Sequence, residues 1–548
     1  MKQNVLKIHP KDNVLVALKN LSKGESVQYE SENFVLADEI AAKHKFFVND
    51  MKAGDEVIMY GVLVGKAQQA IPAGGLMTTQ NVKHAAEPFT YRPYHYKWQA
   101  PDVSKFRNRT FNGYHRSDGR VGTANYWLFI PTVFCENRNL DVIREALHNE
   151  LGYAVTDKYK QKTHQLIEVY KKGEDISNVD LSPRSFGEGP GVRLFKNVDG
   201  IKFLNHQGGC GGTRQDAAVL SKLLAAYADH PNVAGVTVLS LGCQNLQVKD
   251  FQSDLKERNP NFDKPLYIFE QQQSQSEEQL ITEAIRKTFL GLIEANKLER
   301  KPASLDKMVV GVKCGGSDGF SGISANPAVG YFSDMMVALG GKILLAEFPE
   351  LCGAEQNLID RTKDEAAAKK FIQLMTAYSD AATKVGSGFH MNPSPGNIKD
   401  GLITDAIKSA GAARKGGTSP VEDVLDYTEP AVKPGLNLVC TPGNDVEATT
   451  GKAASGATLI LFTTGLGTPT GNPVCPTIKV ATNSSLAKRM SDIIDIDCGP
   501  IVEGDKTIKQ MGEEIMEYCI KAASGEVIPK AVSLNQDDFI PWKRGVSL

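Results

Sequence analysis

Short apolar segments alternate with polar, glycine-containing segments along most of the chain after residue 110. Six of the apolar runs lie at residues 126–133, 201–204, 236–241, 308–312, 342–346 and 457–462. Most of them end in a polar segment, and a helical pattern often follows. This alternation is typical of a parallel sheet covered by helices. We therefore predict an α/β fold, with a catalytic core over residues 111–390 and a smaller C-terminal α/β domain over residues 391–548.

The first part of the chain has a different pattern. Residues 1–87 contain short strand-like runs, at 13–18 and on both sides of Gly61, separated by glycine turns. They predict a small β-rich domain. Residues 88–110 contain three prolines and no regular spacing of apolar residues, which predicts an irregular linker.

The segment from Gly311 to Gly330 combines several signals of a binding site. A buried strand leads into a glycine-rich loop that carries Lys313, Ser317 and Asp318, and a helix is expected to open at Asn326 and the proline after it. Backbone N–H groups at such a loop and helix start attract anions, and ligands of parallel sheets lie at the carboxyl ends of strands. An ordinary turn remains the alternative, but repetition of the arrangement along the chain favours a site.

Charge and cysteine content exclude several classes of protein. The 62 basic and 64 acidic residues nearly balance, so the net charge does not favour binding to nucleic acid or to an anionic membrane surface. No apolar run approaches the roughly 20 residues of a membrane helix, and residues 1–13 lack the apolar core of a signal peptide. Nine cysteines without a CxxC pair indicate reduced thiols in the cytoplasm and argue against a zinc ribbon. Homo-oligomerisation stays open.

Nucleotide-binding and common hydrolase motifs are missing. Lys452 follows a glycine but is succeeded by alanine, so a Walker A motif is absent. No GxGxxG stands at a strand–helix turn, and HExxH is absent.

Several long motifs resemble the altronate/galactarate dehydratases, a family of sugar-acid hydro-lyases. The motifs occupy residues 113–125, 206–211, 313–318, 325–327, 346–350, 353–355, 392–397 and 462–465. The resemblance implies an N-terminal SAF-type β-clip domain containing His44 and Lys45. It also implies dehydration of a sugar acid to a 2-keto-3-deoxy acid, dependent on a metal that is usually Fe²⁺, with Mn²⁺ as an alternative. D-altronate, converted to 2-dehydro-3-deoxy-D-gluconate in hexuronate catabolism, is the expected substrate, and galactarate is the alternative.

Three positions differ from the family pattern. Thr78 and Gln80 stand where many members carry histidine, and Ala124 replaces the usual arginine. The metal ligands and the substrate are therefore less firmly implied than the reaction class.

Dehydration of a 2,3-dihydroxy acid requires a base for the C2 proton, a general acid for the C3 hydroxyl and charge stabilisation of the enediolate. We expect two arginines to bind the carboxylate, a histidine and a lysine to act as base and acid in either order, and imidazole and carboxylate groups to surround the metal. The candidate residues are, for catalysis, His206, Lys313 and Asp318; for substrate binding, Arg116, Arg120, Ser317 and Asn326; and for the metal, His44, Glu350 and Glu355.

Three other functions compete with this hypothesis. An iron–sulfur cluster can replace the divalent metal, with thiolates from Cys135, Cys210, Cys243 and Cys314. A sulfo-lyase related to (R)-sulfolactate cleavage would change the leaving group. A non-catalytic sugar-acid-binding protein is the least favoured, because binding alone needs fewer polar loops.

Overall fold

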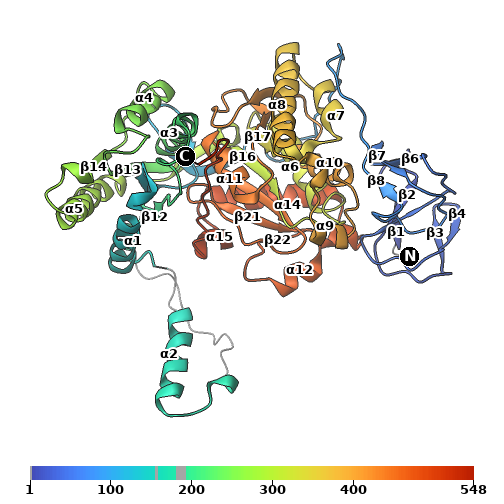
Figure 1. Ribbon diagram of the computed structural model, residues 1–548, viewed down its shortest axis with the longest axis horizontal. Coiled ribbons are helices and arrows are strands. Elements are labelled where there is room, and N and C mark those ends of the chain that lie inside the picture. The colour runs from blue at the N-terminus through green and yellow to red at the C-terminus, as the bar shows by residue number, and fades with distance from the viewer. Residues whose placement is uncertain (1–2, 155–157, 180–192, 548) are drawn as a thin grey trace.

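The computed structural model describes residues 3–154, 158–179 and 193–547, and it confirms a mixed α/β fold. Three parts follow one another along the long axis (Figure 1). A small β-rich domain lies at one end, a seven-stranded sheet in the middle and a four-stranded sheet at the other end. Among the helices of the described ranges, none is long and apolar enough to cross a membrane.

The N-terminal domain consists of small antiparallel sheets, as the sequence predicts. Its strands are β1 (Val5–Leu6), β2 (Val14–Ala17), β3 (Ser26–Tyr29), β4 (Glu32–Val35), β5 (Lys45–Phe47), β6 (Glu56–Met59), β7 (Val62–Ala67) and β8 (Val82–Lys83). Tyr60 and Gly61 connect β6 to β7 and both have positive φ, 58° and 77°. Two such residues form the tight turn whose twist matches a hairpin.

The segment predicted as a linker contains no helix or strand between residues 84 and 109. Several of its side chains fix it to the C-terminal part of the chain. Arg92 pairs with Asp360, and the hydroxyl of Tyr96 donates to the carbonyl of Thr418 at 2.6 Å. Arg92 and Tyr96 therefore attach this segment to the surface of the C-terminal part.

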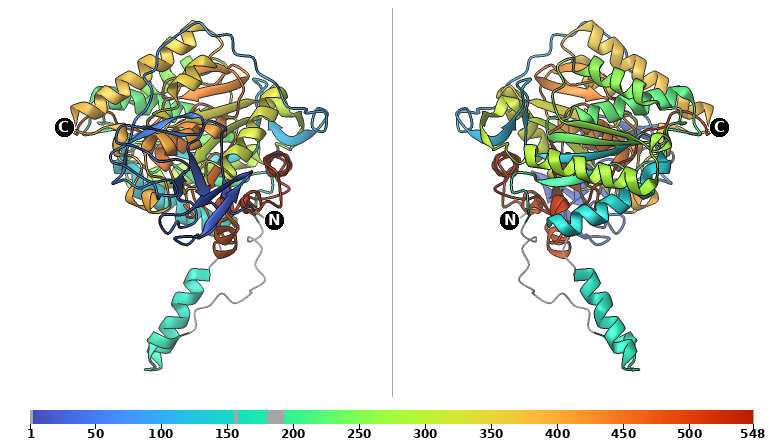
Figure 2. Two further views of the ribbon diagram at one scale, coloured as in Figure 1. Left: turned by 90° about the vertical axis from the view of Figure 1, so that its right-hand side faces the viewer. Right: turned by 90° about the vertical axis from the view of Figure 1, so that its left-hand side faces the viewer.

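Four parallel strands form the smaller of the two parallel sheets. Their order is β12 (Gly200–Phe203), β11 (Tyr126–Pro131), β13 (Val233–Ser240) and β14 (Leu266–Glu270). The helices of this region are α1 (Asn137–Leu151), α3 (Arg214–Ala228), α4 (Val248–Arg258) and α5 (Glu277–Ala295), and α2 (Lys158–Lys171) projects away from the body in all views (Figures 1 and 2). Trp127 is fully buried against Gly235 and Gly291, where an added Cβ would lie 2.3 and 2.0 Å from the indole. The two glycines allow α5 to approach the sheet closely.

Seven parallel strands form the central sheet. Their order is β18 (Val421–Leu425), β19 (Gly435–Val439), β17 (Lys342–Ala346), β16 (Val309–Cys314), β20 (Leu459–Thr464), β21 (Thr477–Ala481) and β22 (Ile496–Asp497). Its helices are α6 (Ala325–Ala338), α7 (Glu355–Asp360), α8 (Glu365–Lys384), α9 (Pro395–Lys399), α10 (Asp405–Ala413), α11 (Asp445–Ala454), α12 (Ser484–Arg489), α13 (Gly499–Val502), α14 (Ile508–Ala523) and α15 (Lys530–Ser533). A small antiparallel sheet of β9 (Thr110–His115), β10 (Val121–Gly122) and β15 (Lys301–Ser304) precedes it in the chain.

The division expected between residues 390 and 391 falls inside the central sheet. β16 and β17 precede that point, whereas their neighbours β20 and β19 follow it. The change from one parallel sheet to the next lies instead between β14 and β16. The pattern of strands and helices does not show which strands share a sheet, because pairing depends on contacts between distant parts of the chain.

Helix α6 begins two residues earlier than the sequence suggests. Ser324 occupies the N-cap position, and Asn326 lies in the first turn. The Asn326 side chain accepts from Thr463 at 2.6 Å and donates to the carbonyl of Gly411 at 3.0 Å. It therefore joins α6 to β20 and α10 instead of capping the helix.

Candidate active site

Strand order places the candidate site at the carboxyl ends of β16 and β20. After β16 the chain forms β17, β18 and β19 on one side of that strand. It then forms β20, β21 and β22 on the other side. Ligands of parallel sheets bind at such a reversal, where the loops after the two strands diverge. These loops bond to each other, since the amides of Gly315 and Gly465 donate to the carbonyls of Thr463 and Gly316.

Three buried lysines and one that is nearly buried converge beside these loops. Lys313 ends β16, Lys408 lies on α10, Lys415 lies in the turn after α10, and Lys452 lies on α11. Burying one ammonium is costly unless it is paired, so four together require a specific set of partners.

Three carboxylates face the lysines. Lys313 pairs with Glu347, and its Nζ lies 2.9 Å from Asp445. Lys408 lies 3.0 Å from Glu350. The other pairs are longer: the second oxygen of Glu347 lies 3.7 Å from the Nζ of Lys415 and 3.8 Å from that of Lys452, and it accepts no hydrogen bond from the described residues.

Glu347 has an unusual backbone. Its φ is 74°, in the left-handed region that non-glycine residues rarely occupy, and it is buried directly after β17. Such strain persists where the surrounding structure imposes it, and it is frequent in functional sites. The conformation places its carboxylate among three of the lysines.

Burial and pairing shift the lysine pKa values in different directions. For Lys313, burial lowers the pKa, but Glu347 and Asp445 outweigh it and hold the pKa well above its usual value. For Lys415, burial is likewise outweighed by Cys314, whose Sγ lies 2.7 Å from its Nζ, and by Glu347. For Lys452, burial dominates and lowers the pKa to about 8, and its Nζ donates no hydrogen bond to any described residue. Lys313 is therefore a fixed cation, whereas Lys452 can lose its proton near neutral pH.

The cluster holds one more lysine than carboxylates. Glu350 stays ionised, since Lys408, Lys313 and Lys415 overcome its burial and lower its pKa to about 2. Asp445 is the most exposed of the three carboxylates, with 28 % of its side chain accessible. The excess of positive charge depends on the protonated form of Lys452, which prevails below its pKa of about 8, and in that form the site is complementary to a small anion.

Of the loop residues that the sequence singles out, Ser317 fits the site and Asp318 does not. The Ser317 hydroxyl is buried and has no hydrogen-bond partner among the described residues, so it can serve a ligand. Asp318 is fully buried and accepts from Ser321, Thr482 and the backbone of Phe320, and it pairs with Lys43 at 3.1 Å. Its role is to hold the N-terminal domain on the central sheet.

The loop around His44 forms the rest of this domain contact. Lys43 also pairs with Asp400 at 3.0 Å, and Lys45 donates to the carbonyl of Gly401 at 2.6 Å. Burial lowers the pKa of Lys45 to about 7. The ring of His44 contacts the carbonyl of Ala42, and burial lowers its pKa. These residues form an interface between domains.

Potential metal ligands gather at the same interface, but they are not the set that the sequence suggests. One ligand atom each from His84, Cys352 and Asp405 lies within 4.8 Å of the other two. One carboxylate oxygen of Asp405 is buried without a hydrogen-bond donor in the described structure, and burial raises the pKa of this group to about 8. An unpaired buried carboxylate beside imidazole and thiol is suited to a divalent cation.

The three suggested metal ligands have other positions. Glu355 neighbours the group, with its pKa raised to about 7 by burial and its carboxylate accepting from the amide of Gly353. Glu350 belongs to the lysine cluster, and His44 to the domain interface. Neither is part of the group of His84, Cys352 and Asp405.

The two arginines expected to bind a carboxylate lie at the opposite edge of the four-stranded sheet. Arg116 donates to the carbonyl of Pro231, two residues before β13 begins. Arg120 pairs with Asp118 and, at 2.8 Å, with Asp229. Both guanidinium groups therefore stabilise the amino-terminal edge of the sheet, away from the carboxyl ends of the strands.

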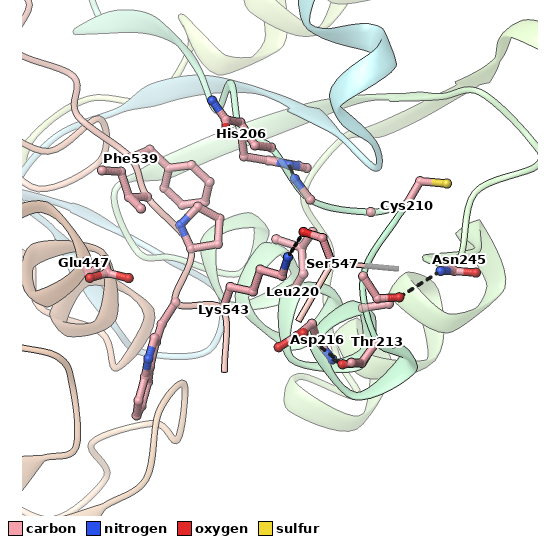
Figure 3. A pocket seen from close by; sticks show the side chains of 18 of the residues that line it. His206, Cys210, Thr213, Asp216, Leu220, Asn245, Glu447, Phe539, Lys543 and Ser547 are labelled. Atoms are coloured by element: carbon pink, nitrogen blue, oxygen red, sulfur yellow. Dashed lines mark hydrogen bonds between the residues drawn. The ribbon is translucent and has the colours of Figure 1, made fainter. Parts of the chain in front are cut away.

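His206 lies at the carboxyl end of the four-stranded sheet, apart from Lys313. Its Nε2 donates to the carbonyl of Pro131 at 2.8 Å, and its Nδ1 accepts from the amide of Gly208 at 3.1 Å. Burial lowers its pKa to about 4, so the ring is neutral and both nitrogens are engaged. It borders a cavity of about 520 Å³ closed by the C-terminal segment, in which Phe539 faces the ring (Figure 3). Its role is to shape this loop, and no catalytic pair with Lys313 forms.

The sequence reasoning missed several residues of the site. Lys408, Lys415 and Lys452 lie in small-residue helical segments, and a lysine among Ala, Gly, Ser and Thr is a signal of burial that went unused. His84 carries no such signal, because its partners are far away in the chain.

Comparisons with known proteins cover nearly the whole chain. Family models match at residues 3–85 (altronate/galactarate dehydratase SAF domain), 113–296 (D-galactarate dehydratase/altronate hydrolase, second domain) and 305–547 (D-galactarate/altronate dehydratase, C-terminal). Altronate dehydratases of Bacillus subtilis and Escherichia coli are 33 % and 34 % identical, over 100 % and 99 % of both chains. A galactarate dehydratase (L-threo-forming) of Escherichia coli is 30 % identical over 95 % of this chain and 93 % of its own.

Replacing Arg120 tests its assignment to structure. We expect Arg120→Ala to lower the free energy of unfolding by about 1–3 kcal/mol, because Asp229 stays buried with weaker partners. KM for the substrate should not change, whereas Lys408→Met should raise it. Urea unfolding and steady-state kinetics of both variants provide the measurements. A tenfold rise of KM in Arg120→Ala would instead place the guanidinium in the substrate site.

Replacing Asp405 tests the metal ligands without requiring turnover. The raised pKa means that the folded chain holds this proton more tightly than the unfolded chain, whose Asp pKa is about 3.9. The stability of the metal-free protein therefore falls as pH rises from about 4 to about 8. We expect Asp405→Asn to abolish this decline and the thermal stabilisation that Mn²⁺ gives at pH 8. Asp426→Asn, an exposed carboxylate, is the control. Equal stabilisation of Asp405→Asn and wild type by Mn²⁺ would exclude Asp405 as a ligand.

Proposed function

Because this chain belongs to the D-galactarate/altronate dehydratase family and is a sugar-acid hydro-lyase, we propose that it converts D-altronate to 2-dehydro-3-deoxy-D-gluconate and water. The observation that carries the proposal is the buried lysine cluster at the carboxyl ends of β16 and β20. Its charged ammonium groups, those of Lys313 and Lys415, are complementary to the carboxylate of a sugar acid. The higher identity to the two altronate dehydratases than to the galactarate dehydratase supports D-altronate.

Fixed cations supply most of the stabilisation needed in the first half of the reaction. Removing the C2 proton places negative charge on the substrate carboxylate, which becomes an enediolate. Ammonium groups that are already buried and oriented stabilise this charge without reorganisation. Lys313 and Lys415, whose pKa values are raised, fulfil that requirement.

Lys452 is the proposed base for the C2 proton. Its pKa of about 8 makes the neutral amine accessible near physiological pH, and its Nζ has no hydrogen-bond partner among the described residues. Lys313 is held charged by Glu347 and Asp445, and Lys415 by Cys314 and Glu347. The Ser317 hydroxyl, also unpartnered, is placed to bind a substrate hydroxyl.

A divalent cation, Fe²⁺ or Mn²⁺, belongs to the proposal as well. His84, Cys352 and Asp405 would hold it, and the unpaired oxygen of Asp405 supports this set. A cation there supplies Lewis acidity to substrate oxygens. Glu350 links the two groups, since it pairs with Lys408 and also raises the pKa of Asp405.

Substrate comparison tests the proposed reaction. Anaerobically purified protein, supplied with Fe²⁺ or Mn²⁺, is offered D-altronate, galactarate and sulfolactate in parallel. We expect 2-keto-3-deoxy acid from D-altronate with a kcat/KM at least tenfold above that for galactarate, and a loss of activity with chelator. Preference for galactarate would reject D-altronate as the substrate. Release of sulfite from sulfolactate would reject the C3 hydroxyl as the leaving group.

The pH dependence of the Lys452→Met variant tests the base. In the wild type, kcat/KM should rise with pH through about 8, because only the neutral amine accepts a proton. Lys452→Met should lower kcat by roughly 10²–10⁴-fold and remove this dependence. Lys264→Met, a half-buried lysine two residues before β14 whose pKa is also lowered by burial, is the control. A variant that keeps both the rate and the pH profile would exclude Lys452 as the base.

A further inference from the structure

We propose that Cys135, Cys210 and Cys243 hold an iron–sulfur cluster at the carboxyl end of the four-stranded sheet. The proposed ligand is a cubane cluster with three thiolate ligands from the chain. This site is separate from both the lysine cluster and the group around Asp405.

The three cysteines follow three neighbouring strands. Cys135 comes after β11, Cys210 after β12 and Cys243 after β13, and β11 lies between the other two. Pro131 pairs with Leu239 in register, so Cys135 and Cys243 both lie four residues beyond the same rung of the sheet. The carboxyl ends of adjacent parallel strands are only about 4.8 Å apart, so the loops begin side by side.

Backbone hydrogen bonds bring the third cysteine to the other two. The amide of Phe134, next to Cys135, donates to the carbonyl of Gly208 at 3.1 Å. The amide of Asn245, two residues after Cys243, donates to the carbonyl of Gly209 at 2.9 Å. Cys210 directly follows these two glycines, so its loop is fixed to both neighbouring loops.

Exposure separates these three cysteines from the other six. Cys135, Cys210 and Cys243 are exposed, Cys352 is half-buried, and the remaining five are buried. Free cysteine is normally a buried residue, so three exposed thiols on adjoining loops are unusual for a packing role. Cys314, the fourth candidate from the sequence, lies in the central sheet beside Lys415 and does not belong to this group.

The loop around Cys210 offers hydrogen-bond donors suited to a cluster. Gly209 and Gly211 have positive φ, 95° and 67°, on either side of Cys210. Alternating conformations of this kind turn successive N–H groups to one side and form the concave anion sites found at phosphates and iron–sulfur clusters. Within the described residues, the N–H groups of Cys210 and Gly211 donate no hydrogen bond. They remain available to the sulfur atoms of a cluster.

Close packing fixes this loop in place. A Cβ on Gly209 would lie 2.1 Å from the carbonyl oxygen of Thr132. His206 adds a further constraint, since its ring bonds to the backbone at Pro131 and Gly208, which belong to two of the three loops. His206, which the sequence suggested as a catalytic base or acid, therefore positions the proposed cluster ligands.

Three thiolates leave one iron of a cubane cluster without a ligand from a cysteine. Cys210 also lines the cavity of about 520 Å³, at the side opposite Glu447 and Phe539 (Figure 3). An open iron there can bind a hydroxyl or carboxylate oxygen of a molecule in the cavity. That role, unlike the cluster itself, rests on the proposed hydro-lyase function.

Anaerobic reconstitution of the full chain tests the site. Protein treated with ferric iron, sulfide and dithiothreitol, then desalted, should carry about four iron and four sulfide ions per chain. It should also show a broad visible absorption band that bleaches with dithionite. We expect Cys135→Ser, Cys210→Ser and Cys243→Ser each to lose at least half of the iron, and the triple variant to lose all of the band. Cys498→Ala, a buried cysteine of the central sheet, should keep the full content.

Circular dichroism and thermal melts, recorded without iron, show whether each variant is folded. Each single variant keeps two of the three thiols, so it tests one ligand at a time. His206→Gln gives a second measurement, because a loosened loop should make the cluster more labile to oxygen without removing a ligand. Iron and sulfide contents that are equal in wild type and triple variant would overturn the proposal, as would a wild type that takes up zinc but no sulfide. Because cluster content is measured without substrate, it remains informative if no sugar acid is turned over.

Discussion

The contact between Glu347 and the surrounding lysines is the interaction on which the candidate active site depends. A carboxylate at the end of β17 faces Lys313 on the next strand, and Lys415 and Lys452 from two helices. Removing one charge would leave several others buried without compensation, which is far more costly than losing a surface pair. This mutual dependence fixes the relative positions of β16, β17, α10 and α11. It also explains why the strained backbone of Glu347 is retained.

Helix α11 joins the two parallel sheets functionally. In its first turn, Asp445 contacts Lys313 of the central sheet, while Glu447 lines the cavity that also contains His206 and Cys210. Loops from the carboxyl ends of both sheets therefore approach one short helix. Two chemically different environments result, one rich in ammonium groups and one bordered by the loop of Cys210, and each suits a different kind of ligand.

Sequence reasoning was most successful where the information was local. The strands β17 and β20 and the glycine turn at Gly61 follow from apolar runs and turn residues. It was least successful where roles depend on distant partners. Arg116 and Arg120 have the right chemistry for a carboxylate, but the sheet places them at its amino-terminal edge. The sequence drew attention to Lys452 only as part of an incomplete Walker A motif. Its burial could not be predicted, because it depends on Gly311 of a distant strand, where an added Cβ would lie 3.0 Å from the lysine side chain.

The N-terminal domain shows how a substitution within the family pattern can be accommodated. Thr78, one of the two positions where the resemblance led us to expect histidine, exchanges backbone-to-side-chain hydrogen bonds with Asn81, and Asn81 also donates to the carbonyl of Leu76. This capped turn leads directly into β8, and the residue after β8 is His84, facing Cys352 and Asp405. The contacts of Lys43 with Asp318 and Asp400 hold the whole domain in the orientation that allows this approach. The proposed metal ligands thus need no histidine at positions 78 or 80, because the turn there positions a histidine a few residues later.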